Sequence, residues 1–176
     1  LPEPPMGSIL HALDVPAFGG DTLWANQYRA FDTLSPGLQT TLRTLVGALP
    51  ASFRMAVTLV QHRHKDSDHV LRALLQERSP LVVCEVEDKM PLEEGHIYVA
   101  PPDYHTLIEP GHFALSTEAP VRFSRPSIDV TFNSAADAYG HRVVGVVLTG
   151  ANTDGALGLR RISDLGGLAI IQDPKT

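Results

Sequence analysis

The chain has 176 residues, 43% of them hydrophobic, which is enough apolar material for one domain with a buried core. Its formal net charge of −6 argues against nucleic acid or an anionic membrane surface as a partner, because either would need a basic face. The single cysteine, Cys84, fits a reducing compartment, and no apolar run reaches membrane-spanning length, so the sequence predicts a cytoplasmic protein without membrane insertion.

The first part of the chain is patterned as helices. After a proline-rich start, apolar residues recur at helical spacing over residues 21–34, which predicts an amphipathic helix. Ser35 and Pro36 then precede a second helical run over residues 37–49. A serine N-cap followed by proline at the first helical position is a typical helix start, so Ser35 has an ordinary structural interpretation.

From residue 55 the pattern changes to an alternation of strands and helices. Strands are expected at residues 55–60, 81–86, 96–100, 143–148 and 168–172, and helices at residues 68–76, 129–139 and 156–165. Residues 106–116 read as a β-hairpin with Pro110 and Gly111 at the turn. This alternation predicts an α/β fold with a doubly wound, mostly parallel sheet.

Two of the expected strands end at polar residues suited to catalysis. One runs into His62, and another runs into Asp154, which lies close to Gly150 and Gly155. Open α/β sheets hold their ligands beyond the carboxyl ends of the strands. A histidine and an aspartate there are two members of a Ser-His-Asp triad, although Asp154 also suits a turn or the N-cap of the helix that follows it. The remaining histidines show no metal-ligand spacing, so no metal site is predicted.

Several ordered motifs give the chain a specific family resemblance. They are L49-P-A-S-F, V60-Q-H, E94-G-H-I-Y-V-A-P-P-D-Y-H, R125-P-S-I-D-V-T-F, V144-G-V-V-L-T-G-A-N-T-D-G-A and G166-G-L-A-I-I-Q-D-P. With them, the chain from about residue 43 to residue 176 resembles the catalytic domain of the bacterial chemotaxis protein-glutamate methylesterases. The resemblance implies hydrolysis of γ-glutamyl methyl esters, and deamidation of glutamine, on the cytoplasmic helices of methylated chemoreceptors.

Residue by residue, the resemblance makes His62 the general base and Asp154 its orienting carboxylate. It puts a backbone donor to the oxyanion near Ala151 and requires no cofactor. The family carries its nucleophile in a Gly-x-Ser-x-Gly-Gly turn after its first strand, and that register falls on Ser35. Because two of the three glycines are missing and Pro36 has no N–H for the oxyanion, impaired activity is expected. A non-catalytic remnant or a receptor-binding module is the alternative.

The N-terminal residues resemble a different family. The run G19-G-D-T-L-W-A-N26 is similar to a segment of the taurine/2,4-D-type Fe(II)/2-oxoglutarate dioxygenases. No positions match that family's metal ligands, so a 2-oxoglutarate-dependent dioxygenase is the less favoured function. We expect a dioxygenase-like fragment over residues 1–40 and a C-terminally truncated methylesterase-like domain over residues 41–176. Loss of the family's first strand would leave an unpaired sheet edge, which predicts self-association.

Overall fold

The computed structural model describes residues 36–62, 70–148 and 153–172. In chain order its elements are α1 (Pro36–Ala48), β1 (Val57–Leu59), α2 (Val70–Gln76), β2 (Val82–Glu85), β3 (His96–Val99), β4 (His105–Glu109), β5 (His112–Ser116), α3 (Ile128–Tyr139), the 3₁₀ turn η3 (Gly140–Arg142), β6 (Val144–Val147), α4 (Ala156–Asp164) and β7 (Leu168–Ile171). The helix expected over residues 21–34 and the N-cap at Ser35 lie outside the described residues.

The strands are mostly parallel, as the alternation of elements predicts. β1, β3 and β2 form a parallel sheet in that order, with Cys84 of β2 paired to Tyr98 of β3. β6 and β7 form a second parallel pair, and β4 and β5 form the expected antiparallel hairpin. The α/β class with a doubly wound, mostly parallel sheet and one hairpin is therefore confirmed.

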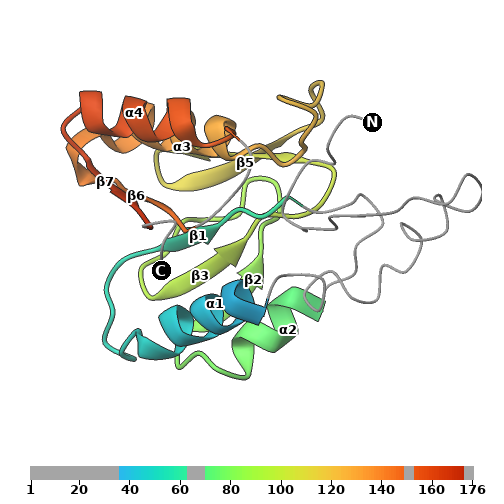
Figure 1. Cartoon of the computed structure of the whole chain (residues 1–176), viewed down its shortest axis with the longest axis vertical. Coiled ribbons are helices and arrows are strands. Elements are labelled where there is room, and N and C mark those ends of the chain that lie inside the picture. Colours follow the sequence, from blue (N-terminus) through green and yellow to red (C-terminus); the bar gives the residue numbers. More distant parts are fainter. Residues whose placement is uncertain (1–35, 63–69, 149–152, 173–176) are drawn as a thin grey trace, which may run out of the picture.

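Helices cover both faces of the three-stranded sheet of β1, β3 and β2 (Figure 1). On one face, Val46 of α1 and Leu75 of α2 pack in a single core cluster with Ile97 of β3. On the other face, the neighbouring β3 residue Tyr98 packs in a second cluster with Ala135 of α3. Successive side chains of a strand point to opposite faces, so a strand buried on both faces must be apolar throughout, which explains the continuous apolar run of β3.

The facing edges of β1 and β6 are open in the described part of the chain. The carbonyl oxygen of Leu59 accepts from the backbone N–H of Ala100, which directly follows β3. Neighbouring residues of a strand point their backbone groups to opposite sides, so those of Thr58 point away from β3. The carbonyl of Val147 accepts from Gln172, so by the same alternation the backbone of Val144 points away from β7. Thr58 and Val144 both line a groove of about 370 Å³, with α3 along one side. Self-association through this edge remains a prediction.

Candidate active site

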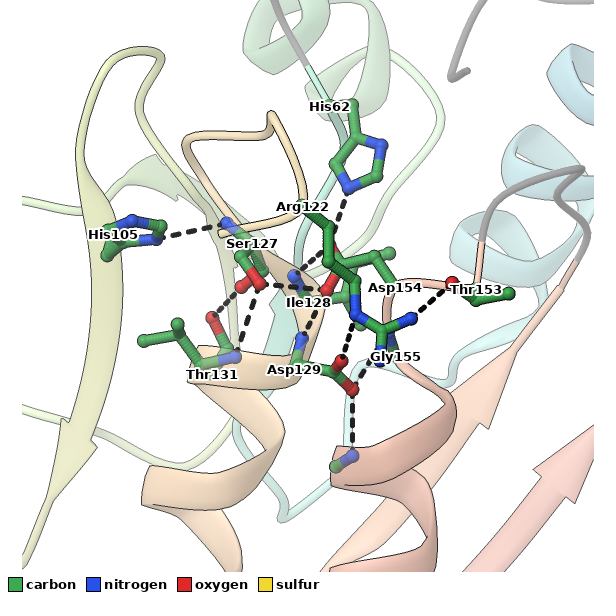
Figure 2. A network of polar contacts seen from close by, with 12 residues as sticks. His62, His105, Arg122, Ser127, Ile128, Asp129, Thr131, Thr153, Asp154 and Gly155 are labelled. Atoms are coloured by element: carbon green, nitrogen blue, oxygen red, sulfur yellow. Dashed lines mark hydrogen bonds and ion pairs between the residues drawn. The ribbon is translucent and has the colours of Figure 1, made fainter. Parts of the chain in front are cut away.

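The two strand-end residues that the sequence singled out lie together. His62 follows β1 and Asp154 lies between β6 and α4, and the imidazole Nε2 is 2.7 Å from the carboxylate Oδ2 (Figure 2). The side chain of His62 is 8% exposed and that of Asp154 is fully buried. Residues that are 92 positions apart in the sequence therefore form one short, buried contact at the carboxyl ends of two parallel strands.

The start of α3 holds the carboxylate of Asp154. The hydroxyl of Ser127 donates to Oδ1 at 2.8 Å, the backbone N–H of Ile128 to Oδ2 at 2.7 Å, and the backbone N–H of Asp129 to Oδ1 at 3.0 Å. The first N–H groups of a helix lack partners within the helix and form a site for negative charge. Asp154 thus caps α3, which precedes it in the chain, and not α4, whose N-cap residue is Gly155.

Asp129 performs the corresponding task for α4. Its Oδ1 accepts from the backbone N–H of Gly155 at 3.0 Å and of Gly158 at 2.8 Å. The two helices approach so closely that a Cβ on Gly158 would lie 2.4 Å from the Cβ of Phe132. The Nε of Arg122 lies 3.6 Å from Asp129 Oδ2 and adds a positive charge on the solvent side. The carboxylate of Asp154 therefore binds the start of α3, and the carboxylate of Asp129 binds the start of α4, next to His62.

A second histidine supports this arrangement. His105 is 2% exposed, and its Nδ1 accepts from the backbone N–H of Ser127 at 3.2 Å. Its Nε2 is 3.2 Å from the carbonyl oxygen of Ala119, which is a partner for an N–H. Because Nδ1 accepts while Nε2 donates, the geometry corresponds to the neutral tautomer with the proton on Nε2. His105 fixes the residue that in turn binds Asp154.

Opposing effects set the charge state of Asp154. Burial by itself raises the pKa of this carboxyl group, because the ionised form loses its hydration. Hydrogen bonds from His62, from the backbone N–H groups of Asp129 and Ile128, and from the Ser127 hydroxyl favour the ionised form and outweigh burial. The result is a pKa lowered from 3.8 to about 2, so the carboxylate is ionised at neutral pH.

This lowered pKa predicts a specific acid sensitivity. Because the pKa of Asp154 is lower in the folded state than in the unfolded chain, the ionised carboxylate stabilises the fold above about pH 4 and stops doing so as the pH falls toward 2. Urea unfolding between about pH 5 and pH 2 should therefore show a loss roughly 2 kcal/mol larger in the wild type than in Asp154→Asn, which has no carboxyl group to titrate. Identical pH dependence of the two proteins would contradict the assignment.

The other predicted site residues cannot be placed against this pair. Ser35 and Ala151 lie outside the described residues, as does His64. Within residues 36–62, 70–148 and 153–172, there is no group of His, Cys, Asp or Glu side chains able to hold a metal ion. The same ranges contain no helix long and apolar enough to cross a membrane.

Sequence reasoning assigned no role to Asp129, His105 or Arg122. A signal for part of this set was present, because Ser127 followed by Asp129 in the first turn is the usual chemistry of a helix start. That signal locates the beginning of α3. It does not indicate that the free N–H groups of α3 bind a carboxylate from a loop 25 residues later in the chain.

Comparison with known proteins identifies the family of this chain. The family model for the CheB methylesterase matches residues 33–176. The chain belongs to the CheB methylesterase family. A protein of Leptospira interrogans, named as a protein-glutamate methylesterase/protein-glutamine glutaminase, is 42% identical over 144 residues, which are 81% of this chain and 75% of the relative.

Other relatives are longer. A protein-glutamate methylesterase/protein-glutamine glutaminase of Symbiobacterium thermophilum is 36% identical over 143 residues, which cover 81% of this chain and 40% of that protein. The crystal structure of the Thermotoga maritima CheB methylesterase catalytic domain superimposes with a TM-score of 0.71 at 28% identity. The superposition covers 77% of this chain and 79% of the Thermotoga chain.

The family match begins ten residues before the point at which the motifs made the resemblance visible, and it includes Ser35. The comparisons give no support to the dioxygenase resemblance of residues 1–40. The division of the chain at residues 40 and 41 stays a prediction.

Proposed function

We propose that this chain is a cytoplasmic serine esterase that hydrolyses γ-glutamyl methyl esters on the cytoplasmic helices of methylated chemoreceptors, with deamidation of glutamine as a second reaction. One observation carries the proposal: the buried pair of His62 and Asp154, 2.7 Å apart at the carboxyl ends of β1 and β6. The names of the Leptospira and Symbiobacterium relatives support the choice of reaction.

The chemistry follows from which ring nitrogen of His62 is occupied. Nε2 faces Asp154, so Nδ1 is the nitrogen that can take the proton from a serine hydroxyl. The serine oxygen then attacks the ester carbonyl, and the imidazolium returns the proton to the departing methoxide, which leaves as methanol. Water hydrolyses the acyl-enzyme by the same proton relay. Asp154 stabilises the imidazolium in both steps and stays ionised throughout, which suits its lowered pKa.

Ser35 is the proposed nucleophile. It directly precedes α1, and it is the residue on which the serine register of the family falls. Ser127 does not compete for the role, because it is fully buried and its hydroxyl donates to Asp154. The backbone N–H near Ala151 is proposed as the oxyanion donor. Since Pro36 supplies no N–H, we propose a lower rate than the Gly-x-Ser-x-Gly-Gly turn would give.

A fluorophosphonate probe tests the nucleophile directly, because it forms a covalent bond only with an activated serine hydroxyl. We expect labelling of the wild type at Ser35, identified by mass spectrometry of the labelled peptide. Ser35→Ala and His62→Ala should both lose the label, since one lacks the oxygen and the other lacks the base. Ser163→Ala, which removes an exposed hydroxyl from α4, should label like the wild type.

The outcomes of this test separate two functions. Labelling that depends on both Ser35 and His62 supports the esterase. A correctly folded wild type that takes no label would favour a receptor-binding module without catalysis, which is the alternative that the altered serine turn suggests.

A further inference from the structure

A tight turn beside the active site displays a large aromatic side chain to solvent. Val121 and Ser124 exchange both backbone hydrogen bonds, at 3.1 and 2.9 Å, so Arg122 and Phe123 form a two-residue hairpin turn. The side chain of Phe123 is among the exposed large hydrophobic groups, and the residue is 90% exposed. A single exposed apolar residue is common on protein surfaces and needs further support before it indicates binding.

The backbone of this turn supplies that support. Arg122 has φ of +49° and Phe123 has φ of +65°, so both lie in the left-handed region. Two-residue turns of this kind normally use Asn-Gly or Asp-Gly, because residues with bulky side chains are strained there. Strained backbone that carries an exposed aromatic ring is a feature associated with function and not with stability.

Residues in and next to the turn are held by polar contacts. Arg122 is bound by Asp129 and Thr153 of the active-site network (Figure 2). One residue after the turn, Arg125 donates to Asp103 at 2.6 Å and to the carbonyl oxygen of Thr117 at 2.7 Å. A side chain displayed from a fixed backbone loses little conformational freedom when it binds a partner, so its apolar contact contributes efficiently to affinity.

The position of the turn indicates the partner. Arg122 contacts Asp129, whose own backbone N–H binds the carboxylate of Asp154, so the turn stands one residue away from the catalytic network. A protein substrate extends beyond the ester group that it presents to His62, and the exposed ring of Phe123, on a turn tied to the same network, is available to the rest of its surface. The aromatic ring therefore suits a macromolecular substrate with an apolar patch close to the modified glutamate.

We propose that Phe123 is a substrate-docking residue, which packs on apolar side chains of the chemoreceptor helix next to the methylated glutamate. This inference rests on the proposed function for the identity of the substrate. It concerns binding alone and requires no turnover.

The test is binding of a soluble, methylated chemoreceptor cytoplasmic fragment, measured by calorimetry in the His62→Ala background so that no ester is consumed. Phe123→Gly is expected to weaken binding about tenfold or more. The same substitution is expected to raise the urea midpoint of unfolding, since glycine adopts positive φ without strain. Phe123→Leu keeps an apolar group on the turn and should retain most of the affinity.

Leu168→Ala is the matched control, because Leu168 is an apolar residue that is 56% exposed at the opposite, amino-terminal end of a strand. It should bind the fragment like the parent protein. The inference would be overturned if Phe123→Gly bound with unchanged affinity or unfolded at a lower urea midpoint. It would also be overturned if Leu168→Ala weakened binding equally, or if the His62→Ala protein did not bind the fragment. If binding depends on Phe123 but the wild-type protein shows no esterase activity, this inference is upheld and the proposed hydrolysis is refuted.

Discussion

Replacing His62 by alanine is expected to lower the rate of methyl ester hydrolysis about a thousandfold. The imidazole of His62 hydrogen-bonds to the buried carboxylate of Asp154, which makes it the base of the proposed reaction. Without the imidazole the serine hydroxyl keeps its proton, and the departing methoxide receives none. The measurement is release of methanol from a methylated chemoreceptor fragment under single-turnover conditions.

His112→Ala is the control for this experiment. His112 also faces a carboxylate, with its Nε2 at 2.8 Å from Glu109, but the pair is partly exposed and belongs to the β4–β5 hairpin. Its removal should leave the rate unchanged. Equal rates for the wild type and His62→Ala would refute the assignment of the base, and an equal loss in His112→Ala would indicate that the rate reports the fold and not the site.

Asp154→Ala is expected to lower the free energy of unfolding by about 3–5 kcal/mol. The substitution leaves the hydroxyl of Ser127 and the backbone N–H groups of Ile128 and Asp129 without their acceptor. These donors lie at the start of α3, where no group within the helix can replace the carboxylate. The measurement is urea unfolding at neutral pH, followed by circular dichroism.

A surface aspartate provides the comparison. Asp137 accepts from Arg161 at 2.8 Å, but both side chains are more than half exposed. Asp137→Ala should therefore change the free energy of unfolding by less than about 1 kcal/mol. Similar losses for the two variants would mean that Asp154 does not organise the start of α3.

Much of the fold could be predicted because its signals are local. The apolar run that became β3 is continuous because this strand is buried on both faces, and the hairpin turn at Pro110 and Gly111 has the expected turn chemistry. The rule that binding sites lie at the carboxyl ends of such strands was sufficient to select His62 and Asp154. Their mutual contact followed from the topology.

The interactions that hold the pair were beyond the reach of sequence patterns. In the sequence, Asp154 suited the N-cap of α4, the helix that follows it. In the structure it accepts from N–H groups at the start of α3, and Asp129 of α3 accepts from N–H groups at the start of α4. Both helices begin with N–H groups that need an acceptor, and the sequence does not say which carboxylate reaches which helix. The close packing of α3 on α4 at Gly158 decides this exchange.

By itself, the sequence determined the α/β class, the hairpin, the family and the two strand-end residues, because periodicity and short motifs depend on neighbours along the chain. Only the tertiary structure decided that Asp154 is ionised and held by Ser127, and that Arg122 ties a strained turn with an exposed Phe123 to the same network. Those properties come from burial and from donors brought together by packing, and no local pattern contains them.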